Sequence, residues 1–390
     1  MLLKPSYPWH DQADEVERFQ CLIDHVSEAW RRGNQYSRLE HSLDNYFRMI
    51  WVLGLSLPIG YAEKHPFSLT GKDIKHCYLL PDRRGPTQPS AVQLDAKDQG
   101  LTIRVAADLP DPEDSDPSFL VTVDSIRLAR PIRYKDYPKT ALAYQNPIMF
   151  VGSATPDLSK IPDSQRGGTL SFSGYFFWVP RVIPQEHNGL LVRINGASGT
   201  LFDETFLKYQ VAERRLSQLI AEVYVYQGLE GALVIDRESF NTAHPHYQIL
   251  ANWVHNSLRL IRNTLKDLQS SARERKAEKE EVKAKAALEA TVDELILEYT
   301  DLDPGDVAEV VVVEDDDELD EAVEEGKVAF LREKIAKATG ATSKKPDSWR
   351  ESHVAAVARL LEAHGLLQDL DRDDQTALIG GIVKLFTIKS

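Results

Sequence analysis

The sequence is poor in cysteine and lacks long apolar runs, and each shortage argues against a class of protein. Its 390 residues include two cysteines, Cys21 and Cys77. That number argues against a disulfide framework or a cysteine-based zinc site and favours a reducing compartment. The N-terminus has no apolar core of signal-peptide length, and no stretch approaches the roughly 20 apolar residues that a membrane helix needs. We therefore expect a cytoplasmic protein that does not enter the membrane.

Familiar catalytic motifs are also missing. The chain has no nucleophile elbow, no HExxH and no paired-carboxylate motif, and the histidines of residues 1–80 form no pair at metal-ligand spacing beside a carboxylate. This argues against a free-standing hydrolase. Acidic residues outnumber basic ones, 60 to 46, for a net charge of −14. Direct binding to nucleic acid is disfavoured, because its footprint should be basic.

The pattern along the chain predicts an α+β protein with several parts. A helical N-terminal segment, 1–80, carries apolar residues at helical spacing over 14–30 and 39–57. A mixed or antiparallel β-rich region follows over 81–240, because short β-prone runs alternate there with proline, glycine and aspartate. Residues 241–290 predict a long helix with a charged end, 291–326 an acidic linker, and 327–390 a small helical C-terminal module.

Two loops, one rich in acidic residues and one containing two glycines, could be interpreted as ligand-binding loops. In each case a loop or turn without a ligand is the simpler interpretation. The acidic loop 108–118 lacks the ligand offsets and turning glycine of a calcium loop, so we expect a solvated loop. The Gly196–Gly199 segment follows a strand and is interpreted as a turn, with anion binding as the alternative.

Residues 189–240 are the most clearly patterned stretch. An alternating run, 190–194, is followed by a turn, an amphipathic segment over 206–219 and two further apolar runs, 220–226 and 232–235. Period two, then 3.6, then two again predicts a strand–helix–strand unit. The last run ends in the charged triplet Asp236-Arg237-Glu238. Two strands that flank a helix, with such a triplet at the end of the last strand, suggest a site that the scaffold positions.

Parts of this stretch resemble a known superfamily. The sequences AEVYV (221–225), GLE (228–230) and ALVIDRESF (232–240) resemble the end of the transducer unit of GHKL ATPases, which include the ninety-kilodalton heat-shock chaperones. GLLVRI (189–194) is similar to their strand with a Gly-hydrophobic-Arg pattern. The resemblance covers roughly residues 140–270, about a third of the chain. It implies a β-α-β transducer-like domain that leads into a long helix.

The resemblance also implies a site. In the chaperones, the Arg of a comparable Arg-Glu pair reaches the nucleotide site of the neighbouring ATPase domain and senses the terminal phosphate. The matching residues here are Arg237 and Glu238, and a fixed, planar cation suits this task. The alternative is an ordinary salt bridge at a strand edge. Arg214 and Arg215 are weaker candidates, because a helical Arg pair is commonly a surface feature.

Departures from the superfamily limit what the chain is expected to do. We find no D-x-G-x-G segment for adenine and no glycine-rich lid, so the chain resembles the middle and C-terminal portion without the nucleotide-binding domain. It should not hydrolyse ATP alone. ATP and Mg²⁺ would be held by a missing domain or a partner, with no cofactor or metal in this chain.

The implied function is a relay that couples nucleotide state to a protein partner or a homodimer. Its partner would be an ATPase domain or subunit, and association with nucleic acid through such a complex stays open. The alternative is a non-enzymatic scaffold that uses its acidic linker and helical C-terminal module.

Overall fold

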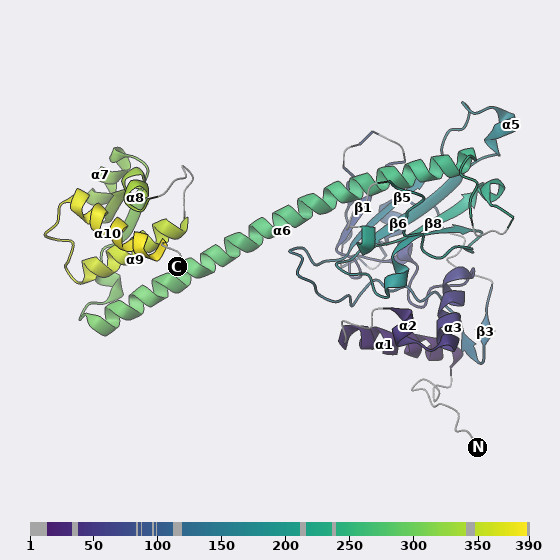
Figure 1. Cartoon of the computed structure of the whole chain (residues 1–390), viewed down its shortest axis with the longest axis horizontal. Coiled ribbons are helices and arrows are strands. Elements are labelled where there is room, and N and C mark those ends of the chain that lie inside the picture. Colours follow the sequence, from purple (N-terminus) through teal and green to yellow (C-terminus); the bar gives the residue numbers. More distant parts are fainter. Residues whose placement is uncertain are drawn as a thin grey trace, which may run out of the picture. The chain divides into compact units, whose positions relative to one another are not determined.

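The computed structural model describes residues 14–32, 38–82, 85–86, 88–95, 97–98, 100–111, 119–210, 216–235, 239–340 and 348–387. The chain divides into two compact units, Met1–Ala272 (unit 1) and Arg273–Ser390 (unit 2), and the long helix α6 (Pro245–Tyr299) contributes residues to both. The fold is α+β, as the sequence predicts: N-terminal helices, a six-stranded mixed sheet, the long helix and C-terminal helices (Figure 1). Among the described helices, none has both the length and the apolar character needed to cross a membrane.

The N-terminal helices form where apolar residues recur at helical spacing. α1 (Glu15–Arg32) buries a stripe that consists of Phe19, Leu22, Ile23, Val26 and Trp30. After the short α2 (Leu39–Ser42), α3 (Asn45–Ser56) begins at Asp44, whose side chain accepts the N–H of Phe47 at 2.9 Å. α3 ends two residues before Pro58, which cannot continue a helix.

The central sheet has the strand order β2-β1-β5-β6-β8-β7. β5, β6 and β8 are antiparallel neighbours, whereas β1 pairs with β5, and β7 with β8, in parallel. β7 therefore lies at one edge. The bounds are β1 His76–Leu79, β2 Ser90–Val92, β5 Ile148–Ala154, β6 Ser171–Trp178, β7 Gly189–Ile194 and β8 Leu219–Gln227.

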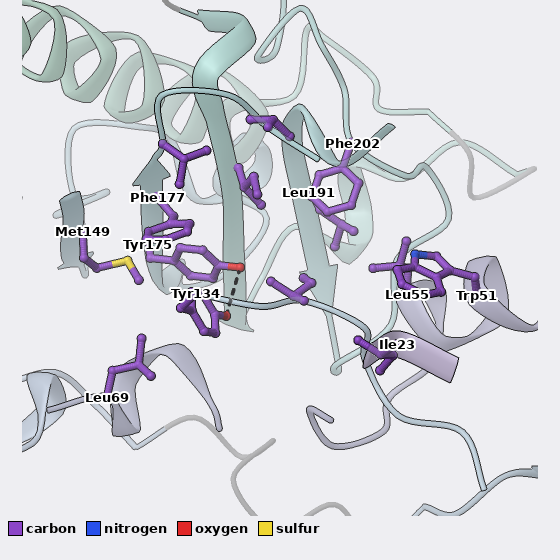
Figure 2. Close-up of a cluster of buried hydrophobic side chains, with 14 of the residues drawn as sticks. Ile23, Trp51, Leu55, Leu69, Tyr134, Met149, Tyr175, Phe177, Leu191 and Phe202 are labelled. Atoms are coloured by element: carbon purple, nitrogen blue, oxygen red, sulfur yellow. Dashed lines mark hydrogen bonds between the residues drawn. The ribbon is translucent and has the colours of Figure 1, made fainter. Parts of the chain in front are cut away.

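Each face of the sheet is covered by different elements, because alternate strand residues point to opposite sides. On one side, Phe172 and Phe176 of β6 pack on Trp253 of α6, with ring centroids 5.2 and 5.9 Å apart. On the other side, Tyr175 and Phe177 join a core that includes Ile23 of α1 and Trp51 of α3 (Figure 2).

Several smaller elements lie between the strands of the main sheet in the sequence. The run 101–107, which reads as β-prone, instead contains the one-turn helix α4 (Ile103–Ala106), because the Thr102 hydroxyl accepts the N–H of Val105 and caps it. β3 (Thr122–Val123) and β4 (Ile126–Arg127) form a short hairpin. α5 (Asp163–Arg166) ends in a left-handed turn at Gly167 and Gly168. Of the acidic loop 108–118, residues 112–118 lie outside the described residues.

The expected strand–helix–strand unit needs correction. β7 and β8 are parallel, as such a unit requires, but residues 204–208 form turns and Leu216–Gln218 is a 3₁₀ helix. The described part of 206–219 contains no α-helix, because Phe206, Leu207 and Lys208 all have positive φ and Leu219 already begins β8. Nor is 232–235 a strand: Glu230–Ala232 is a 3₁₀ helix, and Leu233 makes only an isolated bridge to Phe240.

Unit 2 has its own core. β9 (Val310–Val313) and β10 (Val328–Leu331) pair in parallel and are joined by α7 (Asp316–Glu324). Three further helices, α8 (Arg332–Ala338), α9 (Ser348–Ala363) and α10 (Arg372–Thr387), pack with the strands.

The segment 291–326, expected as an acidic linker, is therefore folded. Asp315 accepts the N–H of Glu318 at the start of α7, whose acidic first turn suits a helix N-terminus, and Leu319 and Ala322 are buried.

Candidate functional site

A cleft of about 930 Å³ lies beside β7. Its walls come from segments close to β7 in space: residues 195–208, residues 230–235 and 239–242, and Tyr247 of α6. The apolar lining consists of Leu190, Val192, Ile194, Ala197, Leu207, Leu233, Val234, Ile235, Phe240 and Tyr247. The other lining residues are mostly polar, so the cleft combines apolar surface with hydrogen-bonding groups, as ligand sites do.

A tight turn forms one rim of the cleft. Asn195 and Gly196 both have positive φ, 52° and 73°, and Ile194 and Ala197 exchange two backbone hydrogen bonds of 2.9 and 3.1 Å. Asn-Gly is the preferred pair for such a two-residue turn, because both positions need a left-handed backbone. The expected turn at Gly196 is thus confirmed. The backbone N–H of Ser198 donates to the carbonyl of Ser56, the last residue of α3, at 3.0 Å.

A second wall consists of an unusual left-handed segment. Phe206, Leu207 and Lys208 have φ of 48°, 58° and 65°, a conformation that non-glycine residues rarely adopt in succession. Asp203 supports it by accepting the N–H groups of Thr205 and Leu207, both at 2.8 Å. His255 Nε2 lies 3.1 Å from both the Phe206 and Leu207 carbonyls and donates to them. Strain of this kind persists only where surrounding contacts over-determine it.

A buried charged cluster lies behind the rim, on the opposite face of β7 and β8. Arg193 and Glu222 are 0% exposed. Glu222 Oε1 accepts from Arg193 Nε at 3.1 Å and from Nη2 at 2.7 Å. Glu222 Oε2 accepts from the hydroxyls of Tyr175 at 3.1 Å and Tyr224 at 2.9 Å, and also from Tyr61. The carboxylate is therefore satisfied on both oxygens, as a buried charge must be.

Arg130 links this cluster to the rim. Its Nη2 donates to the Gly196 carbonyl at 2.9 Å, and Arg193 Nη1 donates to the same oxygen at 3.3 Å. The Arg130 guanidinium also lies over the Tyr61 ring, 5.0 Å from the centroid. The turn therefore directs a carbonyl toward two buried cations, which fixes its position relative to the core.

Burial and charge shift the pKa values of this region. Burial alone would raise the pKa of Glu222, but Arg193, Arg130 and the donated hydrogen bonds hold it at about 2. Burial, followed by the field of Glu222, raises the pKa of Tyr61, Tyr175 and Tyr224, so their hydroxyls stay protonated and donate. The cluster is thus a fixed set of donors around one carboxylate.

Two neutral histidines lie close to the cluster. Burial lowers the pKa of His65 and of His187 to about 3. His65 Nδ1 accepts the N–H of Phe67 at 3.1 Å, and His187 Nε2 accepts the indole N–H of Trp51 at 3.0 Å. Both rings act as acceptors within the core, and neither is available as a cation near neutral pH.

The site residues expected from the sequence lie outside the described residues. This holds for Arg237 and Glu238 and for the weaker candidates Arg214 and Arg215. The described residues that flank the first pair, Ile235 and Ser239, both line the cleft.

Sequence reasoning missed the buried cluster of Arg130, Arg193 and Glu222. A signal for two of them exists: LLVRI and IAEVY each place one charged residue within an apolar strand, where a buried partner is needed.

The described residues offer little direct chemistry. No group of three or more His, Cys, Asp or Glu side chains in them could hold a metal ion. The arrangement can instead bind and orient a ligand. It combines a partly apolar cleft with a turn whose Gly196 carbonyl accepts hydrogen bonds from two buried arginines.

Comparison of the chain with protein-family models, curated proteins and solved structures finds no match.

Proposed function

We propose that the chain is the transducer, or coupling, part of a chaperone-like GHKL ATPase, which relays nucleotide state to a partner or to a second copy. One observation carries the proposal. Arg237 stands in the sequence between Ile235 and Ser239, and both of these line the cleft beside β7. The resembling Arg-Glu pair thus belongs to a segment whose two described ends border a concave surface.

The order of elements gives further support. A strand with the Gly-hydrophobic-Arg pattern, a second strand that ends at Gln227 and a long helix from Pro245 follow one another as the resemblance implies. The connection between the two strands differs, as described above, so the support comes from the strands and the long helix.

The proposed mechanism assigns Arg237 to an ATP site built mainly by another domain or subunit. ATP bound there with Mg²⁺ would supply the phosphoryl chemistry, because this chain shows none of the adenine or lid motifs. Arg237 would place its fixed charge near the terminal phosphate, and Glu238 would orient the guanidinium. A cation supplied in this way stabilises charge that develops during phosphoryl transfer.

The test measures phosphate release by a separately produced GHKL nucleotide-binding domain that carries the D-x-G-x-G segment, with and without this chain. We expect the chain to stimulate release and Arg237→Ala to remove most of the stimulation, since such arginines contribute about 10³-fold or more. Arg275→Ala, a substitution on the exposed part of α6, is the matched control and should behave as wild type. Equal stimulation by the Arg237→Ala and wild-type chains would exclude the proposed role.

A second function, a non-enzymatic scaffold, draws support from unit 2. That unit folds around its own core and exposes Leu385 and Phe386 of α10, 68% and 66%. A scaffold predicts partner binding that is independent of ATP and is lost when residues 290–390 are deleted. A relay predicts that ATP changes the affinity for the nucleotide-binding domain, and a binding titration with and without ATP distinguishes the two.

A further inference from the structure

The outer edge of β7 is only partly used by the protein itself. In the parallel ladder with β8, Leu191 and Arg193 direct their N–H and C=O groups toward β8, and alternate residues direct theirs outward. Leu190 exchanges its outward pair with Asp203, at 3.0 and 2.8 Å, and Ile194 exchanges its pair with Ala197. Val192 lies between these two bridged residues.

Val192 has an outward N–H and C=O with no partner among the described residues. The cause is a bulge: between the two bridges β7 contributes residues 191–193, while the returning segment contributes residues 198–202. The two extra residues carry the returning chain away from Val192. Val192 lines the cleft and is only 8% exposed, so these backbone groups lie in a largely buried place at the border of the cleft.

An unpaired backbone donor and acceptor in a largely buried place are costly unless something binds them. On an extended residue the two groups lie side by side on the same edge of the strand. They match a partner that presents one acceptor and one donor side by side, as an extended peptide residue does in a hydrogen-bonded antiparallel pair. The bridges at Leu190 and Ile194 limit this match to one residue.

The surroundings indicate which side chain such a residue would carry. A residue opposite Val192 points its side chain to the same face as Val192. On that face the cleft is lined by Leu207, Leu233 and Phe240, and Ile235 is fully exposed beside them. An apolar side chain fits this lining.

The charged lining argues against a nucleotide. Lys208 is the cation among the described lining residues, Glu230 is an acid, and Asp203 is occupied by the turn that it caps. Within the described lining, a phosphate would meet one cation and one acid, which does not favour its binding.

We propose that this cleft binds an extended peptide segment, one residue of which exchanges two hydrogen bonds with the Val192 backbone and places an apolar side chain in the cleft. The site is separate from the role of Arg237 and does not depend on ATP. It uses strand-edge recognition, in which backbone bonds give affinity and a side-chain pocket gives selectivity.

The experiment follows the backbone amides of the full-length protein by NMR hydrogen exchange. In the free protein, the Val192 amide should exchange faster than those of Leu191 and Arg193, which are bonded to β8. The probe is a capped pentapeptide with a central leucine between polar residues. At saturation it should slow Val192 exchange by about tenfold or more, a change of about 1.4 kcal/mol.

Two matched probes make the test specific. The same peptide with an N-methylated leucine cannot donate to the Val192 carbonyl and should bind at least about tenfold more weakly. Adenosine tests a nucleobase in place of a peptide. The proposal is overturned if Val192 is as protected as Leu191 in the free protein, if both peptides bind equally, or if adenosine alone protects Val192.

Two variants extend the test to the protein. Val192→Pro removes the outward N–H, which an edge strand tolerates, and should weaken binding of the leucine peptide by about tenfold or more. If that chain does not fold, Ile235→Asp, on a fully exposed residue, should weaken peptide binding by several-fold or more. Val282→Asp, at an apolar position on α6 that is 63% exposed, should not change it. Equal binding by the Ile235→Asp and Val282→Asp chains would count against the site.

Discussion

Replacing Glu222 by glutamine should strongly destabilise unit 1. The substitution keeps the size and shape of the side chain but removes its charge and converts one acceptor oxygen into a donor. Because Oε1 serves Arg193 and Oε2 serves three tyrosine hydroxyls, either orientation of the amide leaves one set of donors without an acceptor.

Two separate arguments give the size of the effect. Removing one member of a fully buried ion pair costs about 3–5 kcal/mol, since the other charge remains buried. The pKa of Glu222 falls from 4.5 to about 2 in the folded protein. At about 1.4 kcal/mol per unit, this shift corresponds to about 3 kcal/mol at neutral pH. The folded-state value is the lower one, so the contribution is present above pH 4.5 and is lost as the pH falls toward 2.

The assay must separate the two units, because a chain with two compact units need not unfold in one step. Trp349 is the tryptophan of unit 2, so a Trp349→Phe background leaves tryptophans only in unit 1. Urea unfolding followed by tryptophan fluorescence near pH 7.5 then reports on unit 1. We expect Glu222→Gln to lower its free energy of unfolding by about 3–5 kcal/mol.

A matched substitution on the surface provides the control. Glu204 is an exposed residue in the turn that follows Asp203, and Glu204→Gln should change the stability by no more than about 0.5 kcal/mol. If Glu222→Gln proved no more costly than this control, Glu222 would not be a buried, ionised partner of Arg193, and the account of the cluster would be wrong.

Two further predictions concern unit 1. His65 and His187 have pKa values of about 3 against 6.5 when unfolded, so the unfolded chain takes up protons first and stability falls as the pH drops below 6.5. From pH 7.5 to 5.5 the loss should be about 1.4 kcal/mol for each histidine, and His187→Gln, which keeps an acceptor for Trp51, should halve it in urea titrations. Gly228→Ala should lower stability by about 2 kcal/mol or more, because φ is +81° and a Cβ would lie 2.5 Å from the Thr169 carbonyl. Gly168→Ala, with φ +92° and open space, should show only the smaller backbone cost in the same assay.

The fold class could be predicted because its main elements carry regular patterns. The stripe on α1, the β-prone run of β6 and the charged helix α6 each depend mostly on local sequence and period. The segment 206–219 failed because its apolar spacing suits a helix, whereas Asp203 and His255 hold a left-handed turn there. The His255 contacts come from a residue 48 and 49 positions away in the sequence, and no local pattern contains them. The folded acidic segment failed for a related reason, since burial of Leu319 and Ala322 requires β9 and β10 as partners.

The residues of the buried cluster could be predicted from the sequence only in part. Arg193 and Glu222 stand out as charges within apolar strands, but their pairing follows from the parallel register of β7 and β8, which places Glu222 opposite Leu191. Arg130 carries no such signal, since it reaches the cluster from an irregular segment after β4. The unpaired Val192 follows from a bulge that only the three-dimensional course of residues 198–202 defines.

The cluster and the cleft are linked through one atom. Both Arg130 and Arg193 donate to the Gly196 carbonyl. Gly196 belongs to the turn in which Ala197 pairs with Ile194, two residues after Val192 on β7. A buried ion pair is often no better for stability than apolar packing, so its presence calls for another role. Here the two arginines fix the backbone that borders the cleft, and Glu222 fixes Arg193. The position of the rim therefore depends on a charge network in the core.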